Sequence, residues 1–430
     1  MKPMKCFTVV IIASVVVCIS AAAAPPTFTK DVLPILQENC QTCHRPLGAN
    51  MAGMIAPMSF MTYEEVRPWS KAIARAVTSG VMPPWHASEE FRGVFKNERS
   101  LTELERETLI EWTRTGAKRG NPKDAPTPRT FVDAGWQLSE TLGEPDLLLK
   151  IPEPYWVGDD VVDIQPSIVI QLEKEELPEM AWVRAIEYKP GSEVVHHIVG
   201  YVTRPGGKEG MRESTNFGQI ASGTNPQNYD EGYGLPLYPE SKITLSMHYH
   251  KEAGPGTGAW DRSEIAVWFH DKPVVHPLQS TQIAHGNFEI PPNQKSWFVG
   301  GARTWDEDII VLELFPHMHL RGSSAKFTAY YPDGKSEVLL DVPKYDYSWQ
   351  TTYEYAEYKT LPAGTRLEWE ITYDNSPESA AENGFNSDRA IRYGGPTTDE
   401  MDLGWLTWTY VEENKWPKKW LRARGQDSSD

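Results

Sequence analysis

The chain has 430 residues, a formal net charge of −17 and 40% hydrophobic residues. This length is enough for two or three domains with sizeable cores. The acidic balance argues against nucleic acid or an anionic membrane as a partner, because both select basic surfaces. Two of the four cysteines lie within the first 20 residues, which leaves only two for the rest of the chain. A disulfide-stapled fold is therefore excluded, and stability has to come from core packing or from bound metals.

The first 24 residues have the layout of a secretory signal peptide. Two lysines precede an apolar run from Phe7 to Ile19, and four alanines at 21–24 follow it. The run is too short for a membrane span, and no stop-transfer charges follow. We expect cleavage within 22–24, which removes both lysines and changes the formal charge from −17 to −19. The expected product is an exported, periplasmic or extracellular protein without stable membrane insertion.

Residues 25–119 are predicted to form a small all-helical domain. Apolar residues recur at helical spacing in TFTKDVLPILQENC (27–40), which runs into CQTCH (40–44). The stretches TYEE (62–65) and TELE (102–105) fit the capping box, in which a hydroxyl and a carboxylate satisfy free amides at a helix start. The helix that follows TELE is expected to stop at Gly116.

A linker rich in proline and polar residues, GNPKDAPTPRT (120–130), precedes a region with a different period. In TLPAGTRLEWEITYDNS (360–376) apolar and polar residues alternate, and AKFTAYYPDGKSEVLL (325–340) is predicted to be a hairpin that turns at Pro332-Asp333-Gly334. The region is therefore predicted to be all-β. We expect two packed sandwich-like (jelly-roll-like) subdomains, at 131–285 and 286–430.

CQTCH is Cys-x-x-Cys-His, in which Cys40 and Cys43 attach a haem through thioethers and His44 becomes an axial iron ligand. A thioredoxin-like pair would need a βαβ setting and a zinc site would need two further ligands nearby, and the sequence around CQTCH offers neither. Haem c is therefore the favoured interpretation. The stretch SGVMPPWHA (79–87) resembles the distal loop of class I cytochromes c, which makes Met82 the favoured sixth ligand and His86 the alternative.

Six of the 11 histidines form three tight groups on predicted strands: HH (196 and 197), MHYH (248 and 250) and PHMH (317 and 319). Residues two apart on a strand point to the same face, so His317 and His319 can bind one ion together.

The adjacent His196 and His197 should point apart. A shared ion would then need a local twist of the strand and different ring nitrogens, with His248 or His250 as the third ligand. Buried histidine pairs without a metal would each need costly hydrogen-bond compensation, which favours metal binding. Imidazole suits copper or zinc. No carboxylate within the three motifs is available as the general base of a zinc hydrolase.

Several motifs follow the order and approximate spacing of copper type II ascorbate-dependent monooxygenases. They are HH, LSMHYH, FPHMHLRG, YDNS (373–376) and TTDEM (397–401). The resemblance covers roughly 146–410, and the whole chain resembles bacterial versions with a cytochrome c domain in front. It implies two coppers. His196, His197 and His248 would hold the electron-transfer copper, while His317, His319 and Met401 would hold the oxygen-binding copper. A thioether favours Cu(I), the state that meets dioxygen.

The chain departs from animal members of that family, which include peptidylglycine α-hydroxylating monooxygenase and dopamine β-monooxygenase. Its β region contains no cysteine, and His250 has no counterpart in their motif. The family chemistry inserts one oxygen atom of O2 into a C–H bond, with two electrons from an ascorbate-like donor or a redox protein. We therefore expect an exported haem c- and copper-dependent monooxygenase acting on a small organic substrate, with electrons relayed through the haem and the three-histidine copper. The alternatives are a haem- and copper-containing electron-transfer protein without oxygenase activity and a redox-silent binding module.

Overall fold

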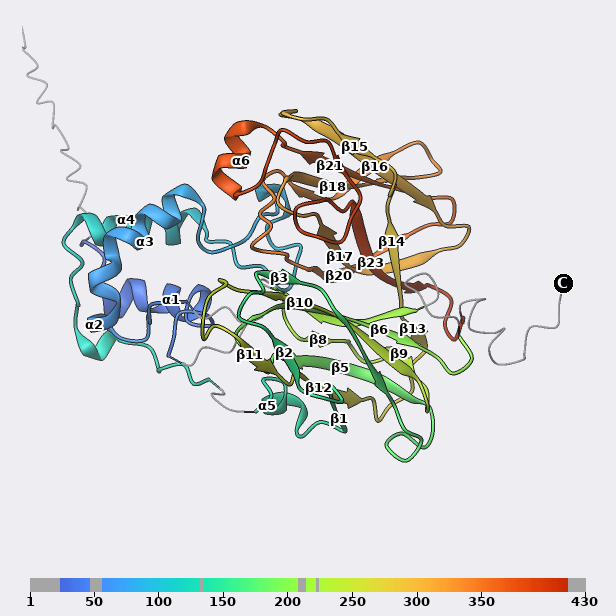
Figure 1. Ribbon diagram of the computed structural model, residues 1–430. Helices are drawn as coiled ribbons and strands as arrows, with labels where there is room; N and C mark the ends of the chain where they lie inside the picture. The colour runs from blue at the N-terminus through green and yellow to red at the C-terminus, as the bar shows by residue number, and fades with distance from the viewer. Residues whose placement is uncertain (1–23, 47–55, 132–134, 208–213, 222–223, 417–430) are drawn as a thin grey trace, which may run out of the picture.

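The computed structural model describes residues 24–46, 56–131, 135–207, 214–221 and 224–416 (Figure 1). A short helical region precedes a large β-rich region of several antiparallel sheets, as the sequence predicts. The expected signal peptide lies outside the described residues except for Ala24. No helix among the described residues is long and apolar enough to cross a membrane.

The helical region is built around one small apolar core. Its main helices are α1 (Leu33–Asn39), α2 (Tyr63–Val66), α3 (Ser70–Ser79) and α4 (Glu103–Arg114), with short turns η1 (Phe28–Val32), η2 (Arg67–Trp69), η3 (Glu89–Phe91) and η4 (Pro122–Asp124). Both predicted capping boxes are confirmed, with Thr62 bonded to Glu65 and Thr102 bonded to Glu105. The apolar residues of the first helical segment pack around Trp112, which is fully buried. The 3.6-residue pattern therefore marks the buried face of this region.

The first half of the β region follows a four-residue helix, α5 (Ser139–Leu142). Its strands are β1 (Leu147–Lys150), β2 (Tyr155–Val157), β3 (Asp163–Ile164), β4 (Ser167–Gln171), β5 (Ala181–Lys189), β6 (Val195–Thr203), β7 (Thr215–Ile220), β8 (Gln227–Asn228), β9 (Tyr233–Leu237), β10 (Lys242–His250), β11 (Ala259–Asp261), β12 (Glu264–Phe269) and β13 (His276–Pro277). One sheet has the order β1-β12-β5-β9-β13 with β8 paired to β5, and a second has β3-β10-β6-β7 with β4 paired to β10. The two sheets share one apolar core.

The second half has its own pair of four-stranded sheets. Its elements are β14 (Gln279–Ile283), β15 (Glu289–Ile290), β16 (Trp297–Thr304), β17 (Ile309–His317), β18 (Gly322–Tyr330), β19 (Ser336–Val342), β20 (Tyr353–Leu361), β21 (Arg366–Tyr373), α6 (Pro377–Asn383), β22 (Ile391–Arg392) and β23 (Leu403–Tyr410). The sheet orders are β14-β23-β17-β20 and β16-β21-β18-β19. The predicted hairpin at Pro332-Asp333-Gly334 joins β18 to β19, and the alternation on β21 is confirmed by its buried and half-buried residues.

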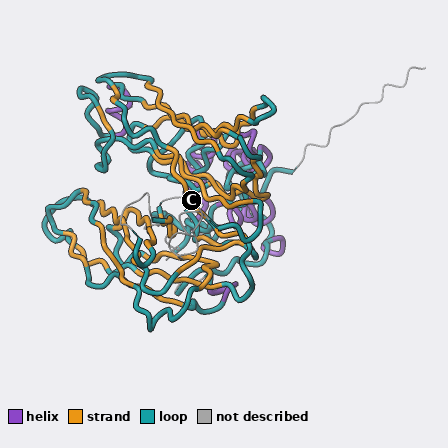
Figure 2. The backbone as a smooth tube through the Cα atoms, turned by 90° about the vertical axis from the view of Figure 1, so that its right-hand side faces the viewer, coloured by secondary structure: helices purple, strands orange, loops and turns teal. Residues whose placement is uncertain are grey.

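The boundary between the two halves at residue 285 stays a prediction. Strand β14 lies before the expected boundary at residue 285, yet it pairs with β23 of the second half. Figure 2 shows the two halves as separate groups of strands, one above the other. The halves meet through residues such as Leu312 of β17, whose side chain is buried in the core of the first half. The cavity described below lies along this contact.

Residues 85–99 attach the helical region to the second half. Phe91 and Phe95 are buried in the core of that half, and Phe95 forms an isolated antiparallel bridge with Tyr355 of β20. Beside them, Lys96 forms an ion pair with Glu354 at 3.2 Å. The ring of Trp85 packs edge-on against Tyr353, with 5.0 Å between ring centroids. The helical region is therefore packed against the β region rather than joined to it by a linker alone.

Glu313 of β17 is a half-buried residue whose carboxyl charge is poorly compensated. Burial, with the neighbouring Glu354 carboxylate, raises its pKa to about 7, while a hydrogen bond from the Thr407 hydroxyl at 2.6 Å works in the opposite direction. A carboxyl with a raised folded-state pKa binds a proton more readily in the folded than in the unfolded protein. The protonated Glu313 carboxyl therefore contributes stability that is fully present below pH 4.5 and is lost as the pH rises through about 7.

We predict that Glu313→Gln stabilises the protein more at pH 8 than at pH 5. The difference in the free energy of unfolding between variant and parent should shift by about 1–3 kcal/mol over this range. Urea unfolding at several pH values measures it. Glu153→Gln, at an exposed carboxylate, is the control. An equal pH dependence in the two variants would contradict the role of burial at Glu313.

Candidate metal centre

His196, His197 and His248 form a cluster that can hold a metal ion. One ring nitrogen from each lies within 4.8 Å of the others. The Nδ1 atom of His197 is 3.3 Å from Nδ1 of His196 and 3.3 Å from Nδ1 of His248, so three Nδ1 atoms converge. Burial lowers the pKa of His196 to about 4 and that of His197 well below its usual value. Both rings are therefore neutral at pH 7, the form that binds a metal.

The backbone explains how two adjacent residues reach one point. Strands β6 and β10 pair with His248 opposite His197, but Tyr249 then pairs with Val195, so His196 is the extra residue of a β-bulge. The bulge turns the His196 ring towards the same side as its neighbour. The predicted local distortion is present. The Nδ1 atoms of His196 and His197 are 3.3 Å apart, and the use of different ring nitrogens for a shared ion stays a prediction.

Asp163 of β3 orients His248. Its Oδ2 atom accepts a hydrogen bond from Nε2 of His248 at 2.8 Å, which leaves Nδ1 facing the cluster. Burial pushes the pKa of Asp163 upwards, but the interactions with His248 and His250 outweigh it and hold the pKa below its usual value. His250 lies outside the cluster, with a 55% exposed side chain and its Nδ1 3.4 Å from Asp163. The choice that the sequence left open between the two histidines is thereby settled in favour of His248 as the cluster member.

A second group consists of His317, His319 and Met401, which line one cavity. Nδ1 of His317 donates to Oε1 of Gln350 at 2.7 Å, and Nδ1 of His319 lies 3.2 Å from the Asp399 carbonyl oxygen. Both histidines therefore have Nε2 available. Burial lowers the pKa of His317 to about 4 and that of His319 to about 3, so both rings are neutral at pH 7. As predicted, the two rings face the same cavity, while Met318 between them is buried in the core.

A buried network around Arg321 places Met401 beside the two histidines. The Glu400 carboxylate accepts from the backbone N–H groups of His319 at 2.8 Å and Arg321 at 2.7 Å. The Arg321 guanidinium, 1% exposed, donates to Asn375 at 2.8 Å and to the Thr398 carbonyl at 2.9 Å. The motifs FPHMHLRG, YDNS and TTDEM thus meet in space.

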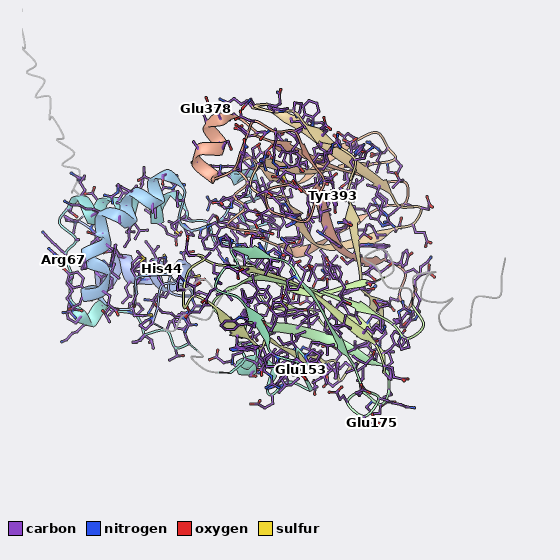
Figure 3. All side chains as sticks on the ribbon, viewed as in Figure 1. His44, Arg67, Glu153, Glu175, Glu378 and Tyr393 are labelled. Atoms are coloured by element: carbon purple, nitrogen blue, oxygen red, sulfur yellow. The ribbon has the colours of Figure 1, made fainter. Side chains whose placement is uncertain are left out.

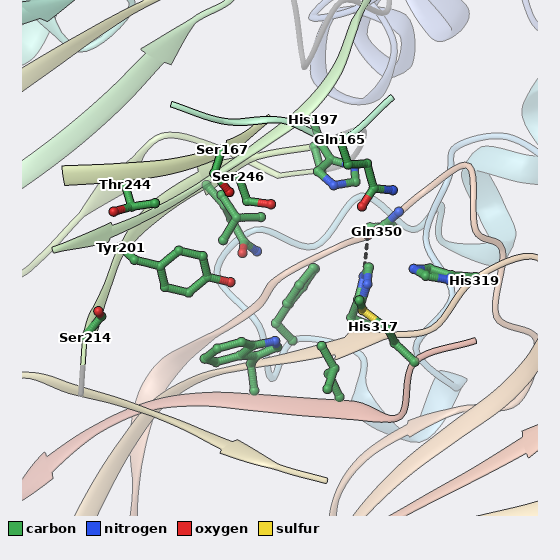
Figure 4. Close-up of a pocket in the computed structure, with 17 residues that line it drawn as sticks. Gln165, Ser167, His197, Tyr201, Ser214, Thr244, Ser246, His317, His319 and Gln350 are labelled. Carbon is green, nitrogen blue, oxygen red and sulfur yellow. Dashed lines mark hydrogen bonds between the residues drawn. The ribbon is translucent and has the colours of Figure 1, made fainter. Parts of the chain in front are cut away.

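The two groups of histidines border the same cavity, which has a volume of about 260 Å³. His197 lines it from the first half, and His317, His319 and Met401 line it from the second (Figure 4). Outside the lining, the Tyr347 ring stacks on His196 with 5.7 Å between ring centroids and lies edge-on to His319 at 6.0 Å. Tyr347 therefore links the two groups of ligands. The sequence contained no signal for Asp163, Gln350 or Tyr347, because each meets its histidine only through tertiary contacts.

The CQTCH segment forms a turn directly after α1. Cys40 and Cys43 do not form a disulfide. Burial, together with the nearby Cys43 thiol, raises the pKa of Cys40 to about 12, whereas a thioredoxin-like pair needs a thiol with a lowered pKa. His44 stacks on Phe60 with ring centroids 4.2 Å apart, and its Nδ1 lies 3.2 Å from the Met58 carbonyl oxygen. Nε2 of His44 therefore remains available, as an axial iron ligand requires.

His44 lies on the side of the helical region that faces the β region, whereas Arg67 lies on the far side (Figure 3). Arg99 is close enough to both Cys43 and Glu354 for each to act on its pKa, which burial lowers. The CQTCH segment is therefore close to the contact between the helical and β regions.

Met82 and His86 occupy different surroundings. Met82 lines a cavity of about 270 Å³ beside α3 and α4, and none of the CQTCH residues lines that cavity. His86 lies near Asp346 and Lys344 of the second half, and burial lowers its pKa. The hydrogen-bond and ring contacts of His44 among the described residues are with Met58 and Phe60. Met82 as the sixth iron ligand stays a prediction, as does His86 as the alternative.

Comparisons with known proteins do not identify a family. No protein-family model matches the chain, and no curated protein matches it. Similar solved structures include the cowpea mosaic virus top component, at 7% identity and a TM-score of 0.28, covering 70% of this chain and 98% of that one. A second is N-glycanase F (PNGase F), at 9% identity and a TM-score of 0.29, covering 62% and 96% of the two chains. These likenesses are too weak to support an argument about fold or function.

We predict that Asp163→Asn weakens metal binding at the three-histidine cluster by about 10–100-fold, because the orienting carboxylate is lost. Competition titration of Cu(I) against a coloured chelator measures the affinity. Binding at the His317 group should not change.

His250→Ala is the matched control, since His250 also contacts Asp163 but lies outside the cluster. It should have little effect on the affinity. An equal loss in both variants would contradict the assignment of the orienting role to Asp163.

Proposed function

We propose that the protein is an exported haem c- and copper-dependent monooxygenase that hydroxylates a C–H bond of a small organic substrate. In this proposal the helical region is a cytochrome c domain, and the two β halves are jelly-roll-like subdomains of the kind found in copper type II ascorbate-dependent monooxygenases. The location would be periplasmic or extracellular, with O2 and a small molecule as the reactants. The source of electrons would be an ascorbate-like donor or a redox protein.

One observation carries the proposal: two unlike sets of metal-binding side chains border one cavity. The first set offers three imidazole nitrogens, and the second offers two imidazoles and a thioether. Imidazoles suit both oxidation states of copper, while the Met401 thioether favours Cu(I). No Asp or Glu is among the described residues that line the cavity, so the general base of a hydrolytic metal site has no candidate there. The ligand sets therefore favour redox chemistry over hydrolysis.

The side chains have distinct tasks in the proposed reaction. Copper bound at the two groups would supply one-electron transfer and the activation of O2. Overall, a C–H group, O2, two electrons and two protons give a C–OH group and water. Gln350 and the Asp399 carbonyl hold the Nδ1 side of His317 and His319, which keeps Nε2 directed to the cavity. Asp163 holds Nε2 of His248, which leaves Nδ1 of that ring directed to the three-histidine cluster. The rings are thereby fixed before any ligand binds, which lowers the cost of binding.

The helical region would supply electrons in this proposal. Cys40, Cys43 and His44 would hold the haem, with Met82 as the favoured sixth ligand. The packing of residues 85–99 against β20 holds the helical region beside the metal groups, which supports transfer within one chain. His196, His197 and His248 would hold a copper ion that supplies one-electron transfer between the haem and the His317 group.

We predict that His317→Ala abolishes hydroxylation and reduces the copper content from about two ions to one, because the ligand set of the second group is broken. The absorption spectrum of the haem should not change. Mass spectrometry of a metabolite extract incubated with the reduced, copper-loaded protein under isotope-labelled O2 measures the reaction.

His285→Ala, at an exposed histidine outside both groups, is the control and should retain activity. Turnover by the His317 variant at the parent rate would refute the assignment of the oxygen site.

We predict that Cys40→Ser combined with Cys43→Ser removes the covalently attached haem while copper binding persists. The mass of the intact chain and haem staining after denaturation measure attachment. Met82→Ala should change the spectrum of the oxidised haem, and His86→Ala should not, since the thioether is the favoured sixth ligand. The parent chain should be purified from a host that attaches haem to c-type cytochromes. A measured mass equal to that of the polypeptide without haem would contradict the haem assignment.

A further inference from the structure

The cavity between the two halves is lined by apolar and uncharged polar side chains and by histidines, as far as the structure describes it. Among the described residues that line it there is no Lys, Arg, Asp or Glu. The nearby carboxylates are turned to other partners. Asp163 is bonded to His248, and Glu400 accepts from the backbone of His319 and Arg321. A charged ligand would therefore lose its hydration without gaining a counter-charge, which is costly.

One wall of the cavity is apolar and lies directly beside His317. Strands β17 and β23 pair with Phe315 opposite Trp405 and His317 opposite Leu403. Side chains that are directly opposite or two apart on neighbouring strands share a face of the sheet. The Phe315, Leu403 and Trp405 side chains therefore form one surface with His317, and all four line the cavity. A hydrocarbon group packed on this surface would lie next to the candidate oxygen site.

The opposite wall carries uncharged polar groups. Ser167, Thr244, Ser246 and Tyr201 line it from β4, β10 and β6, where Thr244 pairs with Tyr201 and Ser246 pairs with Ser167 (Figure 4). Each hydroxyl can donate or accept one hydrogen bond. The Tyr201 ring faces Trp405 across the cavity, with 6.3 Å between ring centroids.

A buried donor also faces this space. Gln350 lines the cavity and is 2% exposed, and its Oε1 atom is occupied by His317. Its Nε2 atom is buried and has no hydrogen-bond partner among the described residues. A buried amide without a partner is costly, so a ligand that accepts a hydrogen bond here would gain the full value of that bond.

We propose that this cavity binds an uncharged small molecule with a hydrocarbon or aromatic part and a hydroxyl, carbonyl or amide group. The apolar part packs on Phe315, Leu403 and Trp405, and the polar group bonds to the hydroxyls of the opposite wall or to Gln350. The volume of about 260 Å³ is below the usual range for drug-sized ligands, so the ligand is small. That this molecule is also the one hydroxylated rests on the proposed function. The carbon nearest Leu403 and His317 would then be the site of oxidation.

Binding to the metal-free full-length protein tests the ligand class without relying on oxygenation. Benzyl alcohol, benzoate and benzylamine have nearly the same shape and are neutral, anionic and cationic at pH 7. Ligand-observed NMR titration should give an affinity for benzyl alcohol that is about tenfold or more above those of the two ions, because each ion lacks a counter-charge in the cavity. Removing metal prevents direct coordination of benzoate or benzylamine. Binding of either ion as tightly as the alcohol would overturn the proposal.

Three variants locate the binding. Trp405→Ala should lower the affinity for benzyl alcohol by about tenfold, because part of the apolar wall is removed. Trp260→Ala, at a 62% exposed tryptophan on β11, is the matched control and should leave the affinity unchanged. Ser246→Ala combined with Thr244→Val should reduce the preference for benzyl alcohol over toluene.

Circular dichroism would establish that each variant is folded. A folded Trp405 variant that binds as tightly as the parent would place the ligand elsewhere and overturn the proposal. Selective binding of the alcohol without incorporation of labelled oxygen would refute the monooxygenase function and leave the ligand class standing.

Discussion

The arrangement of the second group of ligands depends on the buried hydrogen bonds made by Glu400 and Arg321. The carboxylate holds the backbone on either side of Leu320, and the guanidinium holds Asn375 and the chain at Thr398. Burial raises the pKa of Glu400 to about 8, while the backbone N–H groups of His319 and Arg321 and the Arg321 guanidinium act in the opposite direction. Removing the Glu400 side chain would leave these two buried N–H groups without their partner, at a cost of about 1–3 kcal/mol for each group. The position of Met401 beside His319 follows from these hydrogen bonds.

The cavity, in turn, depends on how the two halves pack together. Each half presents one face of a sheet, and the faces differ in chemistry: hydroxyl groups on β4, β6 and β10, and apolar rings beside His317 on β17 and β23. Neither half alone would bring His197 and His317 to one space. The side chain of Leu312, buried in the core of the first half, contributes to holding the halves together. Residues 85–99 then fix the helical region against the second half through Phe91, Phe95 and the ion pair of Lys96 with Glu354.

Local patterns predicted much of the secondary structure correctly, because the interactions that create it are local. The capping boxes at Thr62 and Thr102 and the hairpin at Gly334 involve residues three or four positions apart. Alternation on β21 also predicted the buried face of that strand. Strict alternation alone would point His196 and His197 apart, and the local distortion that a shared ion would need is present as a bulge in β6. The choice between His248 and His250 could not be made from spacing, because both lie on the same strand with the same parity.

The sequence by itself determined a helical region followed by a β region, and it singled out the residues that can bind metals. Those properties follow from short-range periodicity and from the chemistry of histidine, cysteine and methionine. Only the tertiary structure decided which ring nitrogen of His248, His317 and His319 is available for a metal. The other nitrogen of each ring is hydrogen-bonded to Asp163, Gln350 or the carbonyl of Asp399, respectively. It also decided that the two groups of ligands share one cavity, whose lining among the described residues contains no Lys, Arg, Asp or Glu. Both results depend on contacts between segments separated by about 30 to 120 residues, which no local pattern encodes.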